Sequence, residues 1–253
     1  MNKKISVIFF ILSIFLSTHA TGSACVDMID SIFLNTKSMS GTYTKELKLP
    51  NKNYVTKVFF YEDFENNRKK YLIKDSENQT EIFILKDTVF IILPSEKKIF
   101  YYTGNDSLNF SSKFFNINLF DILKVIVTYS KKGSVETKNV KGVSYIKYEN
   151  KDNPLMPTLL LKLNKDNLPE IVEIYDNNNS IVLQTFLKSY KENLPRSIKT
   201  LTNLYGNVLE ENVTIKVLKI NEILKDTIFT FERNGYKLEE FERYLKDAGI
   251  TQW

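Results

Sequence analysis

From Thr42 onward the chain is a succession of short runs rich in β-branched and aromatic residues, separated by Asn, Lys, Asp and Gly. Runs of this kind, bounded by turn residues, predict β-strands, and the chain is therefore expected to be mainly β. Several intervening segments are short enough to be hairpin turns, which predicts antiparallel pairing of consecutive runs. About eleven runs fit this description: 54–61, 70–73, 80–85, 88–93, 98–103, 143–148, 158–163, 170–175, 181–187, 197–204 and 208–218. The hairpin turns are expected at 86–87, 94–97, 164–169, 176–180 and 205–207.

The expected strands differ in how many of their faces are apolar. Val213, Ile215 and Val217 alternate with polar residues, which is typical of a strand with one buried and one solvated face. By contrast, the segments 58–61 and 89–93 are apolar on both faces. Such strands need cover on each side, or they line a cavity.

Three segments predict helices. Residues 25–37 carry apolar side chains at helical spacing and predict an amphipathic helix. The segment 110–129 is too densely apolar for a solvent-exposed loop, so we expect it either to cover the sheet as a lid or to fill the core as a buried helix. Residues 237–248 carry an apolar stripe followed by Gly249, which predicts a short C-terminal helix.

The N-terminus has the features of a secretory signal. Lys3 and Lys4 precede an apolar run of 12 residues, 5–16. A transmembrane helix needs about 20 such residues, so a signal is the better interpretation. Small residues further on would allow cleavage after Ala20 or Ala24. We therefore expect a signal peptide over 1–24, export to the periplasm, and one domain over 25–253.

Cys25 is the only cysteine, so the chain cannot form an intramolecular disulfide. Its place after the expected signal makes it a candidate for lipidation, which would anchor the protein to a membrane. Lipidation signals carry an aliphatic residue three places before the cysteine, where this chain has Gly22. Soluble export is therefore the main expectation, and anchoring through Cys25 is the alternative.

The residues that most enzymes need are missing. The single histidine, His19, lies in the expected signal, which excludes Ser-His-Asp and Cys-His catalysis and a histidine zinc site in the mature chain. The eight glycines form no phosphate-binding loop. Neighbouring carboxylates such as Glu239 and Glu240 are typical of a solvated surface. The sequence predicts a non-catalytic protein without cofactor or metal.

The charge distribution does not favour a nucleic-acid partner. The formal net charge is +5, and two of the positive charges, Lys3 and Lys4, belong to the expected signal. Basic doublets such as Lys69-Lys70 and Lys97-Lys98 are scattered through the chain and do not form a block. The mature chain is nearly neutral, and its basic residues are expected on solvated strand edges and turns.

The order of these elements resembles the LolA/LolB superfamily of outer-membrane lipoprotein carriers, which includes the related N-terminal domains of RseB and MucB. The resemblance rests on the opening helix leading into 40–45, on the hairpin 84–91 followed by Pro94, and on 228–231. It implies a strongly curved antiparallel half-barrel with helices over its concave face and an apolar cavity between them. The chain departs from the family at 62–64 and at Thr88, so a gating arginine is not transferred.

The resemblance and the composition together predict a carrier that binds acyl chains of lipoproteins or lipids. Burial of an acyl chain contributes roughly 0.8 kcal/mol per CH₂, which needs no reactive group. We expect a monomer with a membrane receptor as a further partner. The alternative is an envelope-stress sensor or a lipid-anchored interaction module of the same fold. The side chains expected to contact the acyl chain come from the most apolar stretches: Phe59, Tyr61, Phe83, Ile91, Phe100, Phe114, Phe115 and Phe120.

Overall fold

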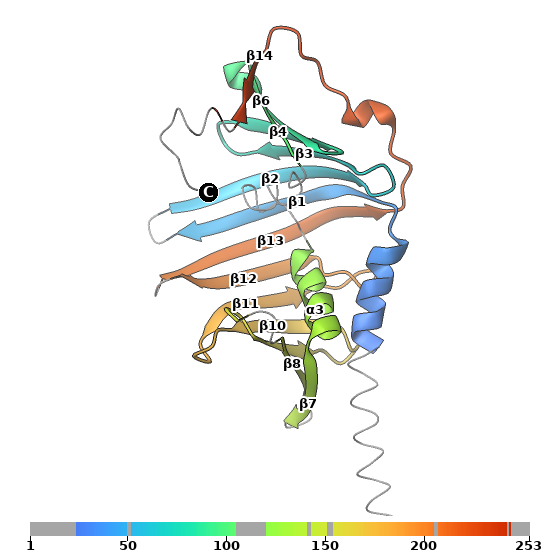
Figure 1. Ribbon diagram of the computed structural model, residues 1–253, viewed down its shortest axis with the longest axis vertical. Coiled ribbons are helices and arrows are strands. Elements are labelled where there is room, and N and C mark those ends of the chain that lie inside the picture. The colour runs from blue at the N-terminus through green and yellow to red at the C-terminus, as the bar shows by residue number, and fades with distance from the viewer. Residues whose placement is uncertain are drawn as a thin grey trace, which may run out of the picture. The chain divides into compact units, whose positions relative to one another are not determined.

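The structure is a computed structural model that describes residues 24–49, 52–104, 120–140, 143–150, 154–204, 207–241 and 243. These residues form mainly β structure with two helices, at 24–35 and at α3 (Asp121–Lys132), and two short 3₁₀ turns (Figure 1). The mainly β prediction and the helix predicted at 25–37 are confirmed. Residues 1–23 lie outside the described residues, so the signal peptide stays a prediction.

Fourteen strands are described, so the prediction of about eleven is wrong. They are β1 (Ser38–Leu49), β2 (Lys52–Asp63), β3 (Arg68–Lys74), β4 (Gln79–Leu85), β5 (Thr88–Leu93), β6 (Lys98–Thr103), β7 (Ser134–Val140), β8 (Val143–Glu149), β9 (Thr158–Leu163), β10 (Pro169–Tyr175), β11 (Ile181–Lys188), β12 (Ser197–Leu204), β13 (Asn207–Ile220) and β14 (Lys237–Glu240). All eleven predicted runs fall on strands, and the additional ones are β1, β7 and β14. Hydrogen-bonded neighbours follow the order β14-β6-β5-β4-β3-β2-β1-β13-β12-β11-β10-β9-β8-β7, so the sheet is open.

The three missed strands have separate causes. β1 begins at Ser38, where Ser and Gly suggest a break in the chain, and β7 is largely polar. Residues 237–240 form β14, which pairs in parallel with β6. The predicted helix over 237–248 is therefore wrong at its start, because a neighbouring strand edge supplies hydrogen bonds that the local sequence pattern does not reveal. Residues 244–248 lie outside the described residues.

The predicted hairpin turns are confirmed where they are described. Lys86, Asn167 and Asn179 adopt positive φ angles of 56°, 59° and 57°, as tight connections between antiparallel strands require. The connection at 94–97 is the 3₁₀ turn η1 (Pro94–Glu96), which ends at Lys97 with a φ of 52°. These turns set the register of neighbouring strands and therefore decide which side chains share a face.

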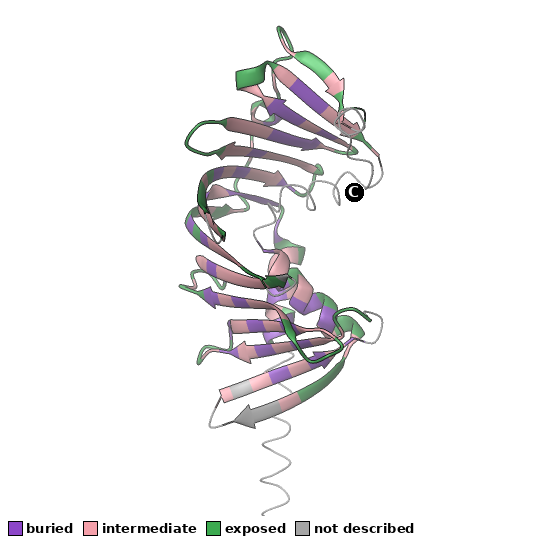
Figure 2. Cartoon of the chain, turned by 90° about the vertical axis from the view of Figure 1, so that its left-hand side faces the viewer, coloured by how far each residue is buried: buried purple, intermediate pink, exposed green. Residues whose placement is uncertain are grey.

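The chain divides into two compact units, and β13 contributes to both. Unit 1 contains residues up to Asn35 and Phe120–Asn212, and unit 2 contains Thr36–Leu119 and Val213–Trp253. In unit 1 both helices lie on the same face of the strands (Figures 1 and 2). The single-domain expectation and the predicted curvature with a helix-covered concave face stay predictions.

The helix face of unit 1 is apolar. Ile146, Tyr148, Leu159, Leu161 and Val172 are each at most 2% exposed. Burial alternates along these strands, as Figure 2 shows by colour, because successive side chains point to opposite faces. The two helices are also joined to each other: Lys131 Nζ of α3 lies 2.7 Å from Asp30, and Lys124 lies over the Phe33 ring.

In unit 2 the strands β4 to β6 are buried on both faces. One face carries Phe83, Ile92 and Ile99, against which Phe231 and Tyr236 pack. The Phe83 and Phe231 ring centroids lie 4.7 Å apart. We call residues 221–236, which include η2 (Asp226–Phe229), the C-terminal strap.

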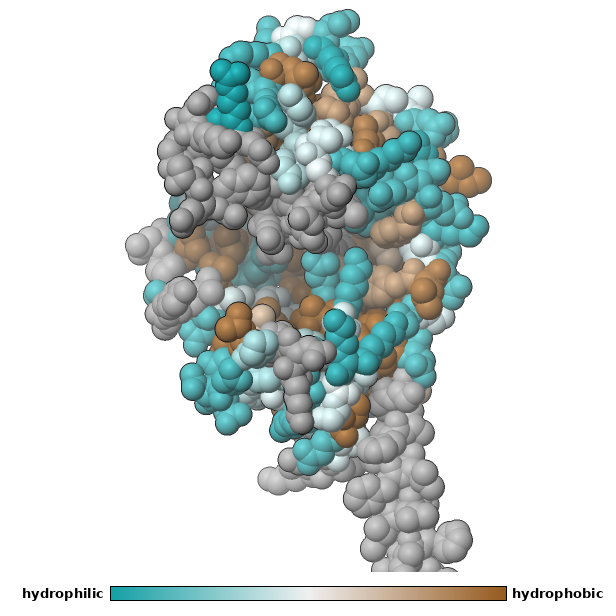
Figure 3. Space-filling view, viewed as in Figure 1, coloured by the Kyte–Doolittle hydropathy of each residue, from teal (hydrophilic) through white to brown (hydrophobic). Residues whose placement is uncertain are grey.

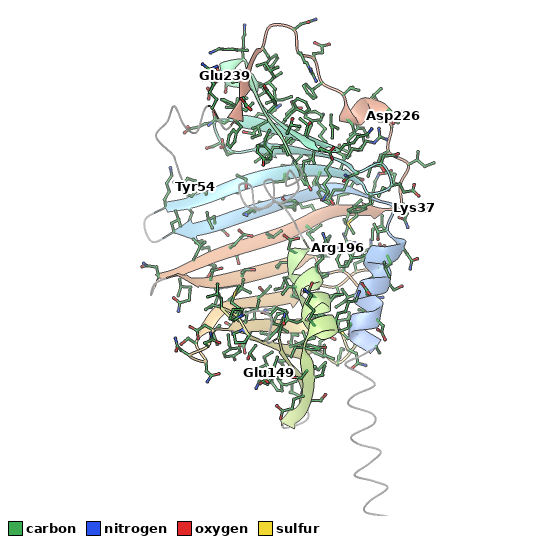
Figure 4. The ribbon with its side chains drawn as sticks, viewed as in Figure 1. Lys37, Tyr54, Glu149, Arg196, Asp226 and Glu239 are labelled. Carbon is green, nitrogen blue, oxygen red and sulfur yellow. The ribbon has the colours of Figure 1, made fainter. Side chains whose placement is uncertain are left out.

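Arg68 fixes the C-terminal strap to the sheet. Its guanidinium lies 2.9 Å from the Asp63 carboxylate and 2.7 Å from Asp226, and it stacks over the Phe229 ring at 4.5 Å. Asp226 projects from η2 in Figure 4. Burial alone would raise the pKa of Asp63, but hydrogen bonds from Asn66 and Arg68 outweigh burial and hold that pKa below its ordinary value.

The described residues on the face drawn in Figure 3 are largely polar. Figure 3 shows small groups of apolar side chains among hydrophilic ones. No helix within the described ranges has both the length and the apolar character that crossing a membrane requires.

Gly41 lies where β1 and β13 approach each other closely. A Cβ at this position would lie 2.2 Å from the Val217 carbonyl oxygen, which is backbone and cannot rotate away. We expect Gly41→Ala to lower the free energy of unfolding by about 1–3 kcal/mol in urea denaturation. Gly104→Ala is the control, because its new Cβ would meet only the mobile end of Tyr102 at 3.2 Å. Equal stability of the two variants would contradict this packing.

The lowered pKa of Asp63 predicts how the free energy of unfolding depends on pH. A carboxyl group whose pKa is lowered by folding stabilises the protein above its unfolded pKa of about 3.9, and that contribution is lost as the pH falls through the folded pKa. We expect Asp63→Asn to reduce stability by roughly 1–3 kcal/mol at pH 7. The difference from the unmodified protein should shrink below about pH 4.

The measurement is urea unfolding across this pH range, with Asp87→Asn as the control because Asp87 is exposed in a hairpin turn. A difference that stays constant with pH would show that Asp63 does not act through its charge.

Candidate functional site

One row of apolar side chains crosses six strands of unit 2. The strand register aligns Gly41, Phe60, Tyr71, Ile82, Ile91 and Phe100 in successive pairs from β1 to β6. The five side chains in this row are each at most 5% exposed. We call the face that carries them the row face; it lies opposite the face that the C-terminal strap covers.

The row face is wide enough for an acyl chain. Neighbouring strands lie about 4.8 Å apart, so a row over six strands extends about 24 Å. One leaflet of a bilayer, whose acyl chains fill half of a core about 30 Å thick, extends about 15 Å. Tyr43 and Val58 widen the apolar area on one side of the row, and Ile84 and Val89 widen it on the other.

The row face also carries a polar group beside its apolar row. Tyr71 Oη donates a 2.6 Å hydrogen bond to Glu62 Oε1, and Lys69 Nζ lies 3.4 Å from the other oxygen of Glu62. The Glu62 and Lys69 side chains are only 12% and 14% exposed. The row face therefore combines a buried apolar row with a nearly buried ion pair next to it.

The eight side chains predicted to contact an acyl chain do not lie together. Ile91 and Phe100 are cross-strand partners on the row face. Phe59, Tyr61 and Phe83 lie on the opposite face, as the register with β1 and β3 shows. Phe83 is buried beneath Phe231 there, and the half-buried Phe59 ring has Lys57 and Lys74 over it.

The remaining predicted residues lie elsewhere. Phe120 is buried at the start of α3 in unit 1, and Phe114 and Phe115 lie outside the described residues. The lipid-binding role of all eight side chains stays a prediction.

Sequence reasoning missed Phe60, Tyr71 and Ile82, which are the centre of the row. Phe60 and Ile82 are adjacent to the predicted residues Phe59 and Phe83, and Tyr71 lies in the predicted strand 70–73. The prediction therefore found the strands but chose side chains on the opposite face. Strands apolar on both faces give no alternation from which to assign a side. Pairing with a strand whose two faces differ clearly in polarity, such as β1, would have shown which side chains share a face.

Cys25 is buried in the helix at 24–35 and is 2% exposed. Burial raises the pKa of its thiol to about 12. Burial also raises the pKa of Tyr148 to about 12, with a smaller electrostatic contribution from Cys25. The thiol therefore belongs to the helix face of unit 1. Among the described residues, no group of three or more His, Cys, Asp or Glu side chains is placed to hold a metal ion.

The fold defined by these strands is that of known solved structures. It is similar to a LolA superfamily protein from Nitrosomonas europaea, with a TM-score of 0.52 and 15% identity over 83% of this chain and 97% of that chain. A DUF1329 family protein from Desulfovibrio piger matches with a TM-score of 0.53 and 13% identity over 82% and 96%. The chain therefore has a LolA-like fold, as its sequence resemblance predicts.

More distant structures match as well. The complex of MucA and MucB from Pseudomonas aeruginosa matches with a TM-score of 0.33 and 8% identity over 83% of this chain and 61% of that chain. The sequence by itself matches no protein-family model and no curated protein.

The burial of Cys25 predicts low thiol reactivity. At pH 8 we expect the folded protein to react with a thiol reagent such as DTNB at least about tenfold more slowly than the urea-unfolded protein, because a buried thiol with a raised pKa forms little thiolate. The measurement is the reaction rate of the folded and of the urea-unfolded protein, with free cysteine as the reference. Rapid reaction of folded protein, or mass evidence of an acyl group on Cys25, would contradict this prediction.

Proposed function

We propose that this protein is an exported periplasmic carrier that holds an acyl chain of a lipoprotein or lipid against the row face and passes it to a partner without catalysis. The single observation that carries the proposal is the continuous apolar row from Phe60 to Phe100 across five strands. The LolA-like fold supports the proposal at the level of architecture.

Burial of alkyl groups is the driving force. Each CH₂ removed from water contributes roughly 0.8 kcal/mol, so a chain of ordinary membrane length contributes on the order of 10 kcal/mol before the entropic cost of binding. The Glu62–Lys69 pair keeps the row face electrically balanced while offering hydrogen-bonding groups at the polar end of a ligand. Release then requires only that the apolar contact be exchanged for one with the next carrier or membrane.

The partners follow from this function. An acyl chain must be received from one membrane-associated protein and given to another, so we expect an inner- or outer-membrane receptor and a monomeric carrier. Export through the signal at 1–24 would bring the chain to the compartment where lipoproteins are sorted. Anchoring through Cys25 is the alternative placement.

Ile91 and Ile92 provide a matched test. They are neighbours on β5, are 5% and 4% exposed, and point to opposite faces. We expect Ile91→Ala and Ile92→Ala to lower the free energy of unfolding by similar amounts, about 2–5 kcal/mol. Only Ile91→Ala should weaken the binding of radiolabelled palmitate, by about tenfold, because only that side chain is on the row face.

A photoactivatable palmitate analogue keeps the proposal testable if either variant fails to fold. After irradiation of the unmodified protein, labelled peptides identified by mass spectrometry should include the row-face residues of β2 to β6. Labelling confined to other surfaces, equal loss of binding in two folded variants, or protein from its native host that carries and binds no acyl material would each overturn the proposal.

A further inference from the structure

Arg196 of unit 1 carries a buried donor that has no partner. It directly precedes β12 and is labelled in Figure 4. The residue as a whole is half-buried, but its Nε atom is buried and forms no hydrogen bond with the part of the chain that the structure describes. Buried side-chain donors are almost always hydrogen-bonded, because an unpaired one loses its contact with water without compensation. The cost is larger for a guanidinium, which is permanently charged.

Two other arginines show what a guanidinium usually contacts in this structure. Arg68 lies between two carboxylates and over an aromatic ring. Arg233 lies over the rings of Phe90 and Phe231, at 5.2 and 5.4 Å from their centroids. Within the described ranges, the Arg196 side chain has neither a carboxylate nor a ring as its partner. Its guanidinium is therefore available to a ligand.

The connection between β11 and β12, residues 189–196, holds the Arg196 backbone in place. Lys191 and Leu194 exchange backbone hydrogen bonds of 3.0 and 3.1 Å across this loop. The Arg196 amide donates a 3.1 Å hydrogen bond to the carbonyl oxygen of Lys188, the last residue of β11. Leu194 is fully buried. The Arg196 side chain therefore starts from a fixed position at the edge of the buried interior of unit 1.

The same loop holds three non-glycine residues at positive φ. Ser189, Glu192 and Asn193 have φ angles of 57°, 53° and 59°. Side chains other than Asn and Asp seldom adopt this region, and backbone strain of this kind tends to be kept where a site needs it. The loop therefore combines backbone strain with an unpaired buried donor, and both are unfavourable for the protein without a ligand.

The loop and the residue before it carry an excess of positive charge. Lys188, Lys191 and Arg196 are accompanied by a single carboxylate, that of Glu192. None of these four side chains forms a salt bridge with a described residue. Lys188, Lys191 and Glu192 are exposed, so solvent screens their charges more strongly than that of the half-buried Arg196. Arg196 is therefore the main attraction for an anion here.

We propose that Arg196 anchors a binding site for a phosphate group. A guanidinium presents its donors as a planar fork, and Nε together with one Nη can donate to two oxygens of the same oxyanion. A phosphate monoester carries nearly two negative charges near pH 7 and three strong acceptor oxygens. It therefore pairs the fork and also offsets the excess charge of the loop, whereas a carboxylate supplies one charge and two oxygens.

This site is separate from the proposed acyl-binding face. Arg196 belongs to unit 1, and the row face belongs to unit 2. The phosphate proposal does not rest on acyl binding, so the two proposals can fail independently. Free phosphate and a lipid headgroup both offer the chemistry that Arg196 would recognise, and the experiment distinguishes these two sources.

The test measures the binding of inorganic phosphate, dihexanoyl phosphatidic acid and acetate to the mature chain by isothermal titration calorimetry. We expect at least one phosphate probe to bind, and acetate to bind at least about tenfold more weakly. Tighter binding of inorganic phosphate assigns the site to free phosphate, and tighter binding of the lipid assigns it to a headgroup. Arg196→Met should weaken phosphate binding at least about tenfold. Arg233→Met is the matched control, because it removes the same charge in unit 2 and should leave binding unchanged.

Stability separates a binding role of Arg196 from a structural one. In phosphate-free buffer, Arg196→Met should raise the urea midpoint of unfolding or leave it unchanged, because it removes a buried donor that has no partner. A saturating phosphate probe should raise the midpoint of the unmodified protein but not that of Arg196→Met.

The proposal would be overturned if neither phosphate probe binds the unmodified protein at millimolar concentration. Acetate binding as tight as phosphate binding, or undiminished phosphate binding by Arg196→Met, would contradict it as well. A clear loss of stability of Arg196→Met in phosphate-free buffer would show instead that the arginine serves packing.

Discussion

The structure of unit 2 depends on burying strands that are apolar on both faces. A sheet with one apolar face needs a single covering layer, whereas β4 to β6 need two, because residues such as Ile91 and Ile92 are similarly buried on opposite sides. The C-terminal strap supplies the cover for one side through Phe231 and Tyr236. The row face on the other side is equally buried, with Phe241 packed edge-on against Phe100, and it is the face for which we propose acyl binding.

The C-terminal strap is held over the sheet by contacts that Arg68 makes with its η2 segment. Arg68 joins Asp63 at the end of β2 to Asp226 of η2, and its guanidinium stacks on Phe229. Since Asp226 is highly exposed, the pair with it contributes little by itself. The stacking of the Arg68 guanidinium on the buried Phe229 ring therefore carries most of the fastening, and Asp63 holds Arg68 in place for it.

Local sequence patterns predict much of the fold but less of the candidate site. The eleven predicted runs and the hairpins at Lys86, Asn167 and Asn179 are confirmed, because turn chemistry and strand propensity act over a few residues. β14 could not be foreseen, since residues 237–240 are a strand only through pairing with β6. A pocket of unit 1 escaped prediction because its lining residues come from β7 to β10 and from the turn after β10, and they share no sequence motif.

The sequence by itself determined that the chain is strand-rich, where its hairpins turn, and that no histidine follows His19. Only the tertiary structure decided which face each side chain of a doubly apolar strand joins and which segment of the chain packs on that face. Phe59 and Phe60 are chemically identical, and the strand register alone separates them by face. The physical reason is that side chains alternate with a period of two: when neighbouring positions are equally apolar, their side is set by hydrogen-bonded neighbours from distant parts of the chain.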